Sequence, residues 1–400
     1  MNILFDQTEA QAPFYNGAAE YAQTLFLKMA EQLCSHPQVK IFCLYHSGAS
    51  FRYAQLSPQN FLGNKQVEYI DFSRKGLKAI VHDYNIDLLF TPCLQMFCDQ
   101  KFGDIKRLGC KVVAVVHDLL DEEMKVSGMQ TFMYQKHPPL LLRFMLSRLK
   151  IRLLSGNMKK REKIMEEIMA HNDATVVTVS QYSRASFHFH YSHLGKEAKV
   201  LYSPMKVSTR KAEIENEQLR NVINNGEKYL LILSADRLMK NAENMLAAFH
   251  KFKETHPGNP FKLITIGYKK NSLFADHISL PFVSASDLEN AYFHCHALLY
   301  PSLFEGFGYP PLEAMKYGKP VICSNVCSMR EVLEDSPIYF SPIYQTDMYK
   351  ALCTFVETPY EQLADKAITQ FQKVANRQKS DLQELSEMLL NPKGLSGLKY

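Results

Sequence analysis

The sequence lacks the long apolar runs that mark membrane-spanning and exported chains. No 18 consecutive residues are apolar, and residues 1–6 carry no basic side chain ahead of an apolar stretch. A helix that spans a bilayer needs about 20 apolar residues, whereas a secretory signal needs a basic start followed by an apolar core. We therefore expect a cytoplasmic protein that neither crosses a membrane nor carries a secretory signal.

Cysteine pairs at metal-binding spacing are also missing. Nine cysteines, an odd number, are scattered between Cys34 and Cys353. Cys323 and Cys327 are the closest pair, but no second Cys or His pair at zinc-finger spacing accompanies them. Structural zinc sites need four such ligands. The pattern favours reduced, buried thiols in a reducing compartment.

The composition shows neither disorder nor low complexity. Hydrophobic residues make up 46% of the 400 residues and charged residues 22%, as in ordinary folded proteins. Single hydrophobic cores stop growing at about 250–300 residues, so a chain of this length is expected to form two domains.

Short apolar runs rich in β-branched residues alternate with longer stretches of helical spacing. This alternation predicts parallel sheets covered by helices. Because residues 206–227 turn polar and charged, we predict α/β domains over 1–206 and 207–375, with a helical tail over 376–400 that could pack back on the first domain. The expected strands are 3–5, 39–45, 87–91, 111–116, 174–179 and 200–202 in the first domain, and 229–233, 261–266, 297–300 and 320–323 in the second.

The positive charge of the chain is local. The formal net charge is +5, yet residues 136–163 alone hold nine Lys or Arg against one acidic residue, Glu162. This argues against a general nucleic-acid binder. Residues 140–163 mix apolar and cationic side chains, so they could dock as a peripheral helix on the anionic inner face of a membrane. A helix packed on its own domain with a solvated basic face is the equal alternative.

The most informative stretch runs from Pro301 to Met315, between an expected strand and an expected helix. Gly306 and Gly308 let the backbone approach a ligand closely, and the prolines at 310 and 311 suit the first turn of a helix. In open parallel sheets ligands bind beyond the carboxyl ends of the strands. We expect the amides of this helix start to face a diphosphate.

Two carboxylates accompany these glycines. Glu305 lies in the loop and Glu313 eight residues later, so both can accept hydrogen bonds from the hydroxyls of one sugar ligand. The alternative is a solvated loop charge at Glu305 and a helix-dipole residue at Glu313.

A basic pair follows another strand of the second domain. Arg237 and Lys240 lie between the strand 229–233 and a helix expected from about Asn241 to Phe252. Arginine offers a planar fork and lysine a point charge, and together they could neutralise a diphosphate. Two solvated basic residues are the alternative, although cations at a helix start oppose its dipole unless an anion binds.

In the first domain, two positions draw attention. His117 stands at the carboxyl end of the buried strand 111–116, where ligands bind, although a satisfied core histidine is the alternative. Gly17 opens a helix after the first strand and could let the backbone approach a phosphate.

These motifs resemble the retaining glycosyltransferases of family four, the glycosyl transferases group 1 type. The family's donor-site signature, two Glu separated by seven residues around Gly-Phe-Gly, is matched by Glu305, Gly306, Phe307, Gly308 and Glu313. The resemblance continues through Ser286–Leu288 and Arg330–Val332 and covers nearly the whole chain. The family also places an Arg and a Lys where Arg237 and Lys240 stand, whereas relatives carry Gly-Arg at the positions of Ser234 and Ala235 and a second glycine at Ala18.

The resemblance implies a fold and a reaction. The fold is the α/β GT-B fold, two Rossmann-like domains facing across a cleft, the first binding acceptor and the second the nucleotide sugar. The reaction moves a hexose from a nucleotide diphosphate sugar to a glycan or lipid-linked acceptor, with retention and as part of cell-surface polysaccharide or lipopolysaccharide assembly. The catalytic group is expected to comprise His117, Arg237, Lys240 and Glu305; the donor-binding group is expected to comprise Gly17, Ser302, Gly306, Phe307, Gly308 and Glu313.

No Asp-x-Asp element occurs that would hold a diphosphate through a metal, so we expect neither a metal nor another cofactor. Two alternatives remain: a two-domain sugar-binding protein without catalysis, and a related GT-B epimerase or phosphorylase. No nucleic-acid partner is expected.

Overall fold

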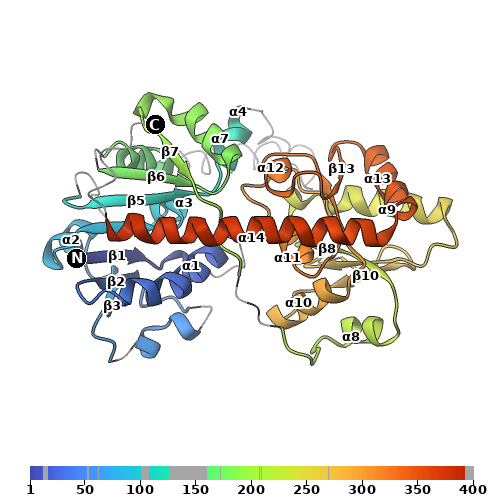
Figure 1. Cartoon of the computed structure of the whole chain (residues 1–400), viewed down its shortest axis with the longest axis horizontal. Coiled ribbons are helices and arrows are strands. Elements are labelled where there is room, and N and C mark those ends of the chain that lie inside the picture. The colour runs from blue at the N-terminus through green and yellow to red at the C-terminus, as the bar shows by residue number, and fades with distance from the viewer. Residues whose placement is uncertain are drawn as a thin grey trace, which may run out of the picture. The chain divides into compact units, whose positions relative to one another are not determined.

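The chain forms two compact units, seen in the computed structural model in Figure 1. One unit contains Met1–Lys206 together with Gln378–Tyr400, and the other contains Val207–Arg377. The structure describes residues 1–11, 17–51, 54–61, 63–100, 108–126, 160–171, 173–206, 208, 210–268 and 270–391.

The first unit is built on a seven-stranded parallel sheet of order β3-β2-β1-β4-β5-β6-β7. Its central strands are continuous apolar runs, because helices cover both faces of a parallel sheet. The strands are β1 (Asn2–Asp6), β2 (Lys40–Tyr45), β3 (Val67–Asp71), β4 (Leu88–Thr91), β5 (Lys111–Val116), β6 (Ala174–Thr178) and β7 (Ala198–Val200).

Helices of the first unit connect these strands and cover the sheet. They are α1 (Gly17–Cys34), α2 (Leu77–Asp83), α3 (Leu94–Cys98), α4 (Leu120–Val126) and α7 (Gln181–Tyr191), with short 3₁₀ turns η1 (Glu9–Gln11), η2 (Ala54–Leu56), η3 (Pro58–Phe61) and η4 (Ser192–Leu194). Residues 160–169 are also helical. One core joins the sheet to α2, α3 and α7 through fully buried side chains such as Leu89, Ile80 and Phe187.

The second unit has a six-stranded parallel sheet of order β10-β9-β8-β11-β12-β13. Its strands are β8 (Tyr229–Leu233), β9 (Lys262–Ile266), β10 (His277–Leu280), β11 (Ala297–Tyr300), β12 (Val321–Ser324) and β13 (Ile338–Phe340). Its helices are α8 (Glu217–Asn224), α9 (Ala242–Thr255), α10 (Ala285–His294), α11 (Tyr309–Met315), α12 (Met329–Leu333) and α13 (Gln345–Glu357), with the 3₁₀ turn η5 (Leu238–Lys240). Helix α9 packs against α13, whereas α10 packs against α11 and α8.

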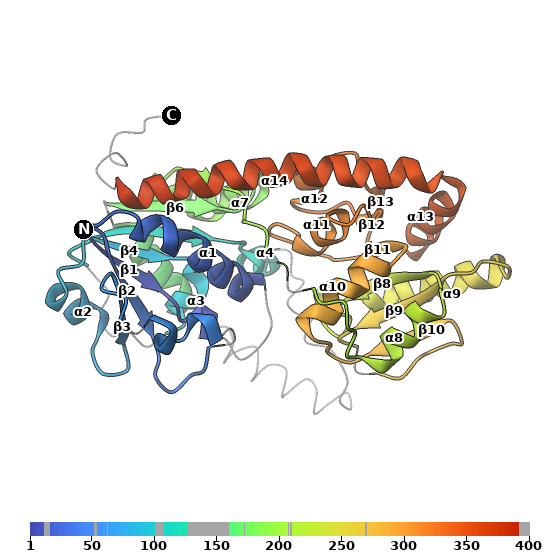
Figure 2. The same cartoon turned by 60° about the horizontal axis from the view of Figure 1, so that its bottom comes forward.

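Both sheets reverse their strand order once. In the first unit the chain moves outward from β1 to β3 and returns to place β4 beside β1; in the second it moves from β8 to β10 and returns to place β11 beside β8 (Figure 2). At such a reversal the two following loops run in opposite directions, and ligands of open α/β sheets bind there. The loops after β8 and β11 are therefore where a ligand of the second unit is expected.

The C-terminal helix is longer than the sequence pattern indicated. Instead of starting near residue 376, α14 runs without interruption from Tyr360 to Leu390, as Figure 1 shows. Its first part belongs to the second unit and its part from Gln378 to the first.

Within the described residues, no helix is both long and apolar enough to cross a membrane.

Candidate functional site

The loops that follow β8 and β11 are joined by a backbone hydrogen bond. The N–H of Leu303, after β11, donates to the carbonyl of Met239, after β8, at 2.8 Å. Gly267, at the end of β9, lies against the first of these loops, since a Cβ added to it would stand 3.4 Å from the Cα of Ser234. The residues after three neighbouring strands are thus held in fixed positions.

The loop after β8 has an unusual backbone. Ser234 and Asn241 adopt the left-handed conformation, with φ of 51° and 54°, which non-glycine residues rarely do. Asn241 stands at the start of α9, and its side chain does not cap this helix. Its amide instead donates to the carbonyl of Pro342 at 2.9 Å and accepts from Asn244 at 2.7 Å. These contacts fix the end of the segment that carries Lys240.

Lys240 connects the two loops through its side chain. Its ammonium donates to the hydroxyl of Tyr300 at 2.9 Å and forms an ion pair with Glu305. The two charged side chains are only 12% and 15% exposed. The carboxylate of Glu305 therefore supplies the anion that a lysine at this helix start requires.

Glu305 is ionised at neutral pH. Burial alone raises the pKa of a carboxyl group, but the charge of Lys240 and hydrogen bonds from Lys240 and Tyr300 outweigh it and hold the pKa of Glu305 below its usual range. An ionised carboxylate only accepts hydrogen bonds. Glu305 can thus accept from hydroxyls or stabilise positive charge, but it has no proton to donate.

Arg237 occupies a different position from Lys240. Its side chain is exposed at the start of η5, and its charge still reaches Tyr300, lowering the pKa of that phenol against the stronger effect of burial. Arg237 and Lys240 thus place two cations beside the end of β11, one exposed and one held in place.

The loop from Ser302 to Gly308 is fixed by its packing. The buried Ser302 accepts a hydrogen bond at its carbonyl from Ser324 Oγ at 2.6 Å, and the Glu305 carbonyl accepts from Ser328 Oγ at 3.1 Å. Phe307 is 5% exposed and meets the ring of Tyr309 edge to face. The loop is therefore anchored to β12 and to the start of α12.

Gly308 is required by the geometry of this loop. Its φ is +90°, and a Cβ added there would stand 2.3 Å from Cε of the buried Met329. Only glycine satisfies both conditions without rearrangement. Gly306, two residues earlier, lies in the same anchored segment.

The helix start after Gly308 has fewer backbone amides than an ordinary first turn. Helix α11 has seven residues, and its first positions hold Pro310 and Pro311, which have no N–H to offer. Those two positions therefore contribute no amide, and the expectation that this helix start faces a diphosphate stays a prediction. Neutralising charge at this edge comes from Lys240 and Arg237.

Glu313 lies just after the first turn of α11. One carboxylate oxygen, Oε2, accepts a hydrogen bond from the buried Tyr292 hydroxyl at 2.6 Å. Tyr292, on α10, was not identified from the sequence. It fixes the orientation of the carboxylate of Glu313.

His117 lies in the first unit, immediately after β5. Its Nε2 is 2.8 Å from the carbonyl of Pro92, and its ring meets Tyr21 edge to face at 4.5 Å. Burial, opposed in part by the Pro92 hydrogen bond, lowers the pKa of His117 to about 4. The ring is neutral at pH 7, and because a carbonyl only accepts, Nε2 carries the proton and Nδ1 the lone pair.

The chain around His117 is held in place on both sides. Ser183, on α7, donates to the carbonyl of His117 at 2.6 Å, and Gln95, on α3, donates to the carbonyl of Asp118. The Asp118 carboxylate in turn accepts from the N–H of Leu120 at 3.2 Å at the start of α4. His117 is thus placed by three surrounding elements.

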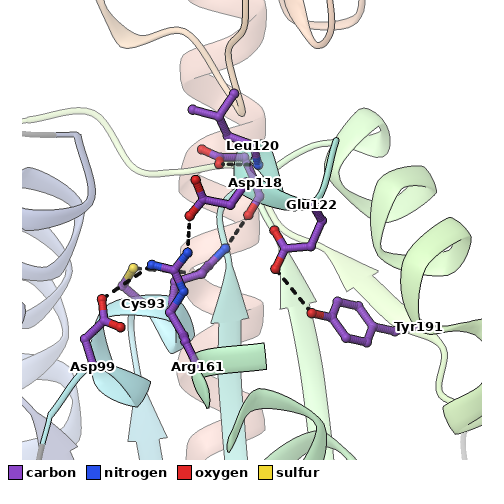
Figure 3. A network of polar contacts seen from close by, with 9 residues as sticks. Cys93, Asp99, Asp118, Leu120, Glu122, Arg161 and Tyr191 are labelled. Carbon is purple, nitrogen blue, oxygen red and sulfur yellow. Dashed lines mark hydrogen bonds and ion pairs between the residues drawn. The ribbon is translucent and has the colours of Figure 1, made fainter. Parts of the chain in front are cut away.

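A network of polar contacts fixes α4, which follows His117 in the chain (Figure 3). Arg161 forms ion pairs with Asp99 at 3.4 Å and with Asp121, and Tyr191 donates to Glu122 at 3.3 Å. Arg161 is one of the basic residues that the sequence assigned to a membrane-facing segment. It is 15% exposed and engaged with carboxylates of its own unit. For Arg161, the packed alternative holds.

Two further predictions concern Gly17 and the basic segment 140–163. Gly17 is the first residue of α1, and a Cβ added there would meet no described atom within 4 Å, so local packing gives no reason for a glycine. The rest of the basic segment 140–163, up to residue 159, lies outside the described residues.

The predicted site residues therefore form two groups. Arg237, Lys240, Ser302, Glu305, Phe307 and Glu313, with Gly306 and Gly308, lie in the second unit around the ends of β8 and β11 and the start of α11; Gly17 and His117 lie in the first unit. In the part of the chain that the structure describes, no three His, Cys, Asp or Glu side chains gather as metal ligands would.

Comparison with known proteins adds to this geometry. Residues 213–362 match the family described as glycosyl transferases group 1, and this match lies within the second unit. O-antigen chain mannosyltransferase B of Escherichia coli is 46% identical over 63 residues, which are 16% of this chain and 16% of that protein. O-antigen chain mannosyltransferase RfbU of Salmonella typhimurium is 36% identical over 109 residues, 27% of this chain and 29% of that protein. The matches thus span less than a third of either relative.

The likeness of fold extends further than the likeness of sequence. The crystal structure of WaaG, a glycosyltransferase involved in lipopolysaccharide biosynthesis, superposes with a TM-score of 0.61 over 97% of this chain and 99% of that one, at 15% identity. The chain therefore has the GT-B fold, with two Rossmann-like units.

Proposed function

Because residues 213–362 match the glycosyl transferases group 1 family, we propose that the protein transfers a hexose from a nucleotide diphosphate sugar to a glycan or lipid-linked acceptor. The observation that carries this proposal is the contact of Lys240 with Glu305 and Tyr300 at the strand reversal of the second unit. The ammonium of Lys240 can bind the diphosphate of a nucleotide sugar, and the carboxylate of Glu305 can accept hydrogen bonds from its sugar. The second unit thus binds the donor, and the first unit binds the acceptor.

Lys240 acts on the leaving group. The bond between the anomeric carbon and the phosphate oxygen breaks with its electron pair passing to the diphosphate, and the ammonium of Lys240 stabilises the charge that develops there. The exposed guanidinium of Arg237 adds to this stabilisation as a planar fork. Glu305, being ionised, accepts from sugar hydroxyls and favours the positive charge that grows on the sugar ring.

The acceptor completes the reaction. Its hydroxyl oxygen bonds to the anomeric carbon on the face that the diphosphate leaves, so the configuration is retained. The proton of that hydroxyl passes to the departing phosphate, which balances the transfer without a protein base. His117, neutral with its lone pair on Nδ1, accepts a hydrogen bond from a substrate hydroxyl. Retention is tested by the anomeric configuration of the product in NMR spectra.

The sugar we propose is mannose. Both curated relatives reported above are mannosyltransferases of O-antigen chains. Their names support a mannosyl donor and a place in the assembly of a cell-surface polysaccharide or lipopolysaccharide.

A thermal-shift panel of GDP-mannose, UDP-glucose and other nucleotide sugars tests the donor. A ligand at 100 times its dissociation constant stabilises the folded state by about 2.7 kcal/mol, and we expect GDP-mannose to give the largest shift. Release of nucleoside diphosphate that depends on acceptor then identifies a transferase. Binding without release indicates a sugar-binding protein; interconversion of the donor sugar indicates an epimerase; transfer to inorganic phosphate indicates a phosphorylase.

We also propose that no metal ion takes part, since Lys240 provides positive charge at the diphosphate. Transfer should keep its rate in excess EDTA. Loss of activity in EDTA that magnesium or manganese restores would overturn this part of the proposal.

Of the basic segment 140–163, peripheral binding at the inner face of a membrane is proposed for residues 140–160, which precede the packed Arg161 and carry six basic residues and no acidic one. Sedimentation with anionic vesicles should weaken when Arg148, Lys150 and Arg152 are replaced by Gln. A native protein that ignores such vesicles at low salt would contradict it.

A further inference from the structure

Tyr300 is placed between the two charged residues of the proposed donor site. It is the last residue of β11, and its side chain is 2% exposed. Such a tyrosine at the end of a core strand is ordinarily a packing residue. Here its hydroxyl meets Lys240 at 2.9 Å. Burial, the charge of Glu305 and a hydrogen bond to Glu305 raise the pKa of the phenol, and the same hydrogen bond helps Lys240 to lower the pKa of the carboxyl group.

The hydroxyl, rather than the ring face, is what Lys240 contacts. The ammonium nitrogen is 2.9 Å from the hydroxyl oxygen but 4.7 Å from the ring centroid. The oxygen accepts from Lys240, and the hydroxyl proton is left to donate to the carboxylate of Glu305. One neutral group therefore holds both members of the ion pair.

This arrangement matters when a donor binds. A bound diphosphate competes with Glu305 for the ammonium of Lys240. Without Glu305, the lysine side chain would sample several rotamers, and fixing it again at the phosphate would cost conformational entropy. Tyr300 is uncharged and does not compete with phosphate. It can keep its hydrogen bond to Lys240 while Glu305 turns toward the sugar.

Building on the proposed function, we propose that Tyr300 is a positioning residue of the donor site, whose hydroxyl holds the Lys240 ammonium at the leaving phosphate while Glu305 is exchanged for substrate. Removing the hydroxyl in Tyr300→Phe leaves the ring and its packing in place. The matched control is Tyr229→Phe on the neighbouring strand β8, a buried tyrosine whose hydroxyl donates to the carbonyl of Ala291 at 2.8 Å, away from Lys240 and Glu305.

The first experiment needs no substrate. The titration of Glu305 is followed by ¹³C NMR of the side-chain carboxyl groups, with Glu305→Gln used to assign the signal. Lys240 and Arg237 keep their charges in the variants, so a change reports the lost hydrogen bond. We expect the pKa of Glu305 to rise in Tyr300→Phe, because a hydrogen bond to the charged form favours that form, and to stay at the native value in Tyr229→Phe. An unchanged pKa in Tyr300→Phe overturns the inference, even for a protein that transfers no sugar.

The second experiment separates binding from turnover, with GDP-mannose as the donor probe. For Tyr300→Phe we expect kcat to fall by about 10- to 100-fold, the scale of a hydrogen bond to a charged group, with donor KM changed by less than about threefold. The acidic limb of the pH profile should move to higher pH with the pKa of Glu305. Native kcat in Tyr300→Phe, or an equal loss in Tyr229→Phe, overturns the positioning role. A native protein that turns over no nucleotide sugar of the panel contradicts the proposed function instead.

Discussion

Lys240 is the residue on which the proposed chemistry depends most, because it is the cation held in place at the end of β11. Lys240→Ala removes a charge whose interaction strengthens as the glycosidic bond breaks. We expect kcat to fall by about 10² to 10³, the scale of losing one preorganised stabilising group, and donor KM to change less. Steady-state kinetics, with folding checked by circular dichroism, measures this.

The structure offers a closely matched control. Lys253 is 13% exposed, compared with 12% for Lys240, and is paired with Asp276 at 3.2 Å near the end of α9. Lys253→Ala should cost stability without lowering kcat of the remaining folded enzyme. If the two variants lose turnover equally, Lys240 has no special part in transfer.

His117 should titrate far below ordinary histidines. With a folded-state pKa of about 4 and an unfolded value of about 6.5, the unfolded chain binds the proton first as the pH falls. Stability contributed by the neutral ring is therefore lost between pH 6.5 and 4. In a pH titration, the ring chemical shifts of His117, assigned with His117→Gln, should change with a midpoint near pH 4.

The same variant isolates this effect in unfolding experiments. Asp6, whose pKa is raised to about 6 chiefly by burial, works in the opposite direction, since stability grows as the pH falls through its range. We expect the free energy of unfolding to fall more steeply from pH 6.5 to 4 in the native protein than in His117→Gln. A steeper fall in the variant would show that His117 is not kept neutral by burial.

At the residue scale, the sequence identified the charged residues of the candidate site but not the buried tyrosines whose hydroxyls bind them. The structure brings Lys240 and Glu305 into contact, and both had been selected from the sequence. Tyr300 and Tyr292, which hold Lys240 and Glu313, were not, because a tyrosine in an apolar run looks like any core residue. Which buried hydroxyl faces a charge depends on tertiary packing that no local spacing encodes.

Among the elements, the loop before α11 depends on Gly308. An alanine there must adopt a φ of +90° and displace Met329, whereas Gly226→Ala meets a φ of +65° with open space around the new Cβ. We expect Gly226→Ala to cost about 1–2 kcal/mol in urea unfolding, the ordinary penalty of the left-handed conformation, and Gly308→Ala to cost more. The additional loss of unfolding free energy in Gly308→Ala measures the steric clash of the new Cβ with Met329.

A double-mutant cycle checks this assignment. Met329→Ala is destabilising alone, but combined with Gly308→Ala it should recover part of the excess, because the two side chains no longer compete for space. Strict additivity of the two costs would mean that the φ of Gly308, and not Met329, requires the glycine.

The strands themselves were predictable in the middle of each sheet and not at its edges. The observed β5, β8 and β11 have the predicted bounds, because strands covered on both faces read as continuous apolar runs. The strands β3, β10 and β13 were missed and β7 was placed two residues late, and all four are edge strands. An edge strand is only partly buried, so sequences such as Val-Glu-Tyr-Ile-Asp in β3, with polar residues among apolar ones, do not stand out.

At the scale of the whole molecule, α14 contributes to both units. Its later part belongs to the first unit, where the Asp381 carboxylate accepts from the N–H of Tyr202 at 2.7 Å and the side chains of Leu385 and Leu389 are buried. Its earlier part holds the second unit, where Gln370 donates to the carbonyl of Val332 at 2.8 Å. Further hydrogen bonds join the tail to the first unit, among them the bond from Ser386 Oγ to Gln32 at 2.7 Å.

Replacing Leu385 and Leu389 together by Ala should therefore destabilise the first unit selectively. Each deletion of a buried leucine costs about 2–5 kcal/mol, which is a large part of the stability of a domain. Hydrogen exchange should accelerate in β1 to β7 while β8 to β13 keep their protection. Lys379→Ala, on an exposed position of the same helix, is the control. Equal acceleration in both sheets would show that the two units unfold together.

The division of α14 between the units also bears on the order in which the protein can mature on the ribosome. Domains generally fold as units while the chain is made, the N-terminal ones first. Here Val207–Arg377 is one continuous stretch, whereas the unit that begins at Met1 is completed only by residues from Gln378 onward. The second unit can reach its native state while the unit begun earlier still lacks its last residues. During that interval the first unit lacks the buried side chains of Leu385 and Leu389, so we expect the half synthesised first to be the half more exposed to aggregation.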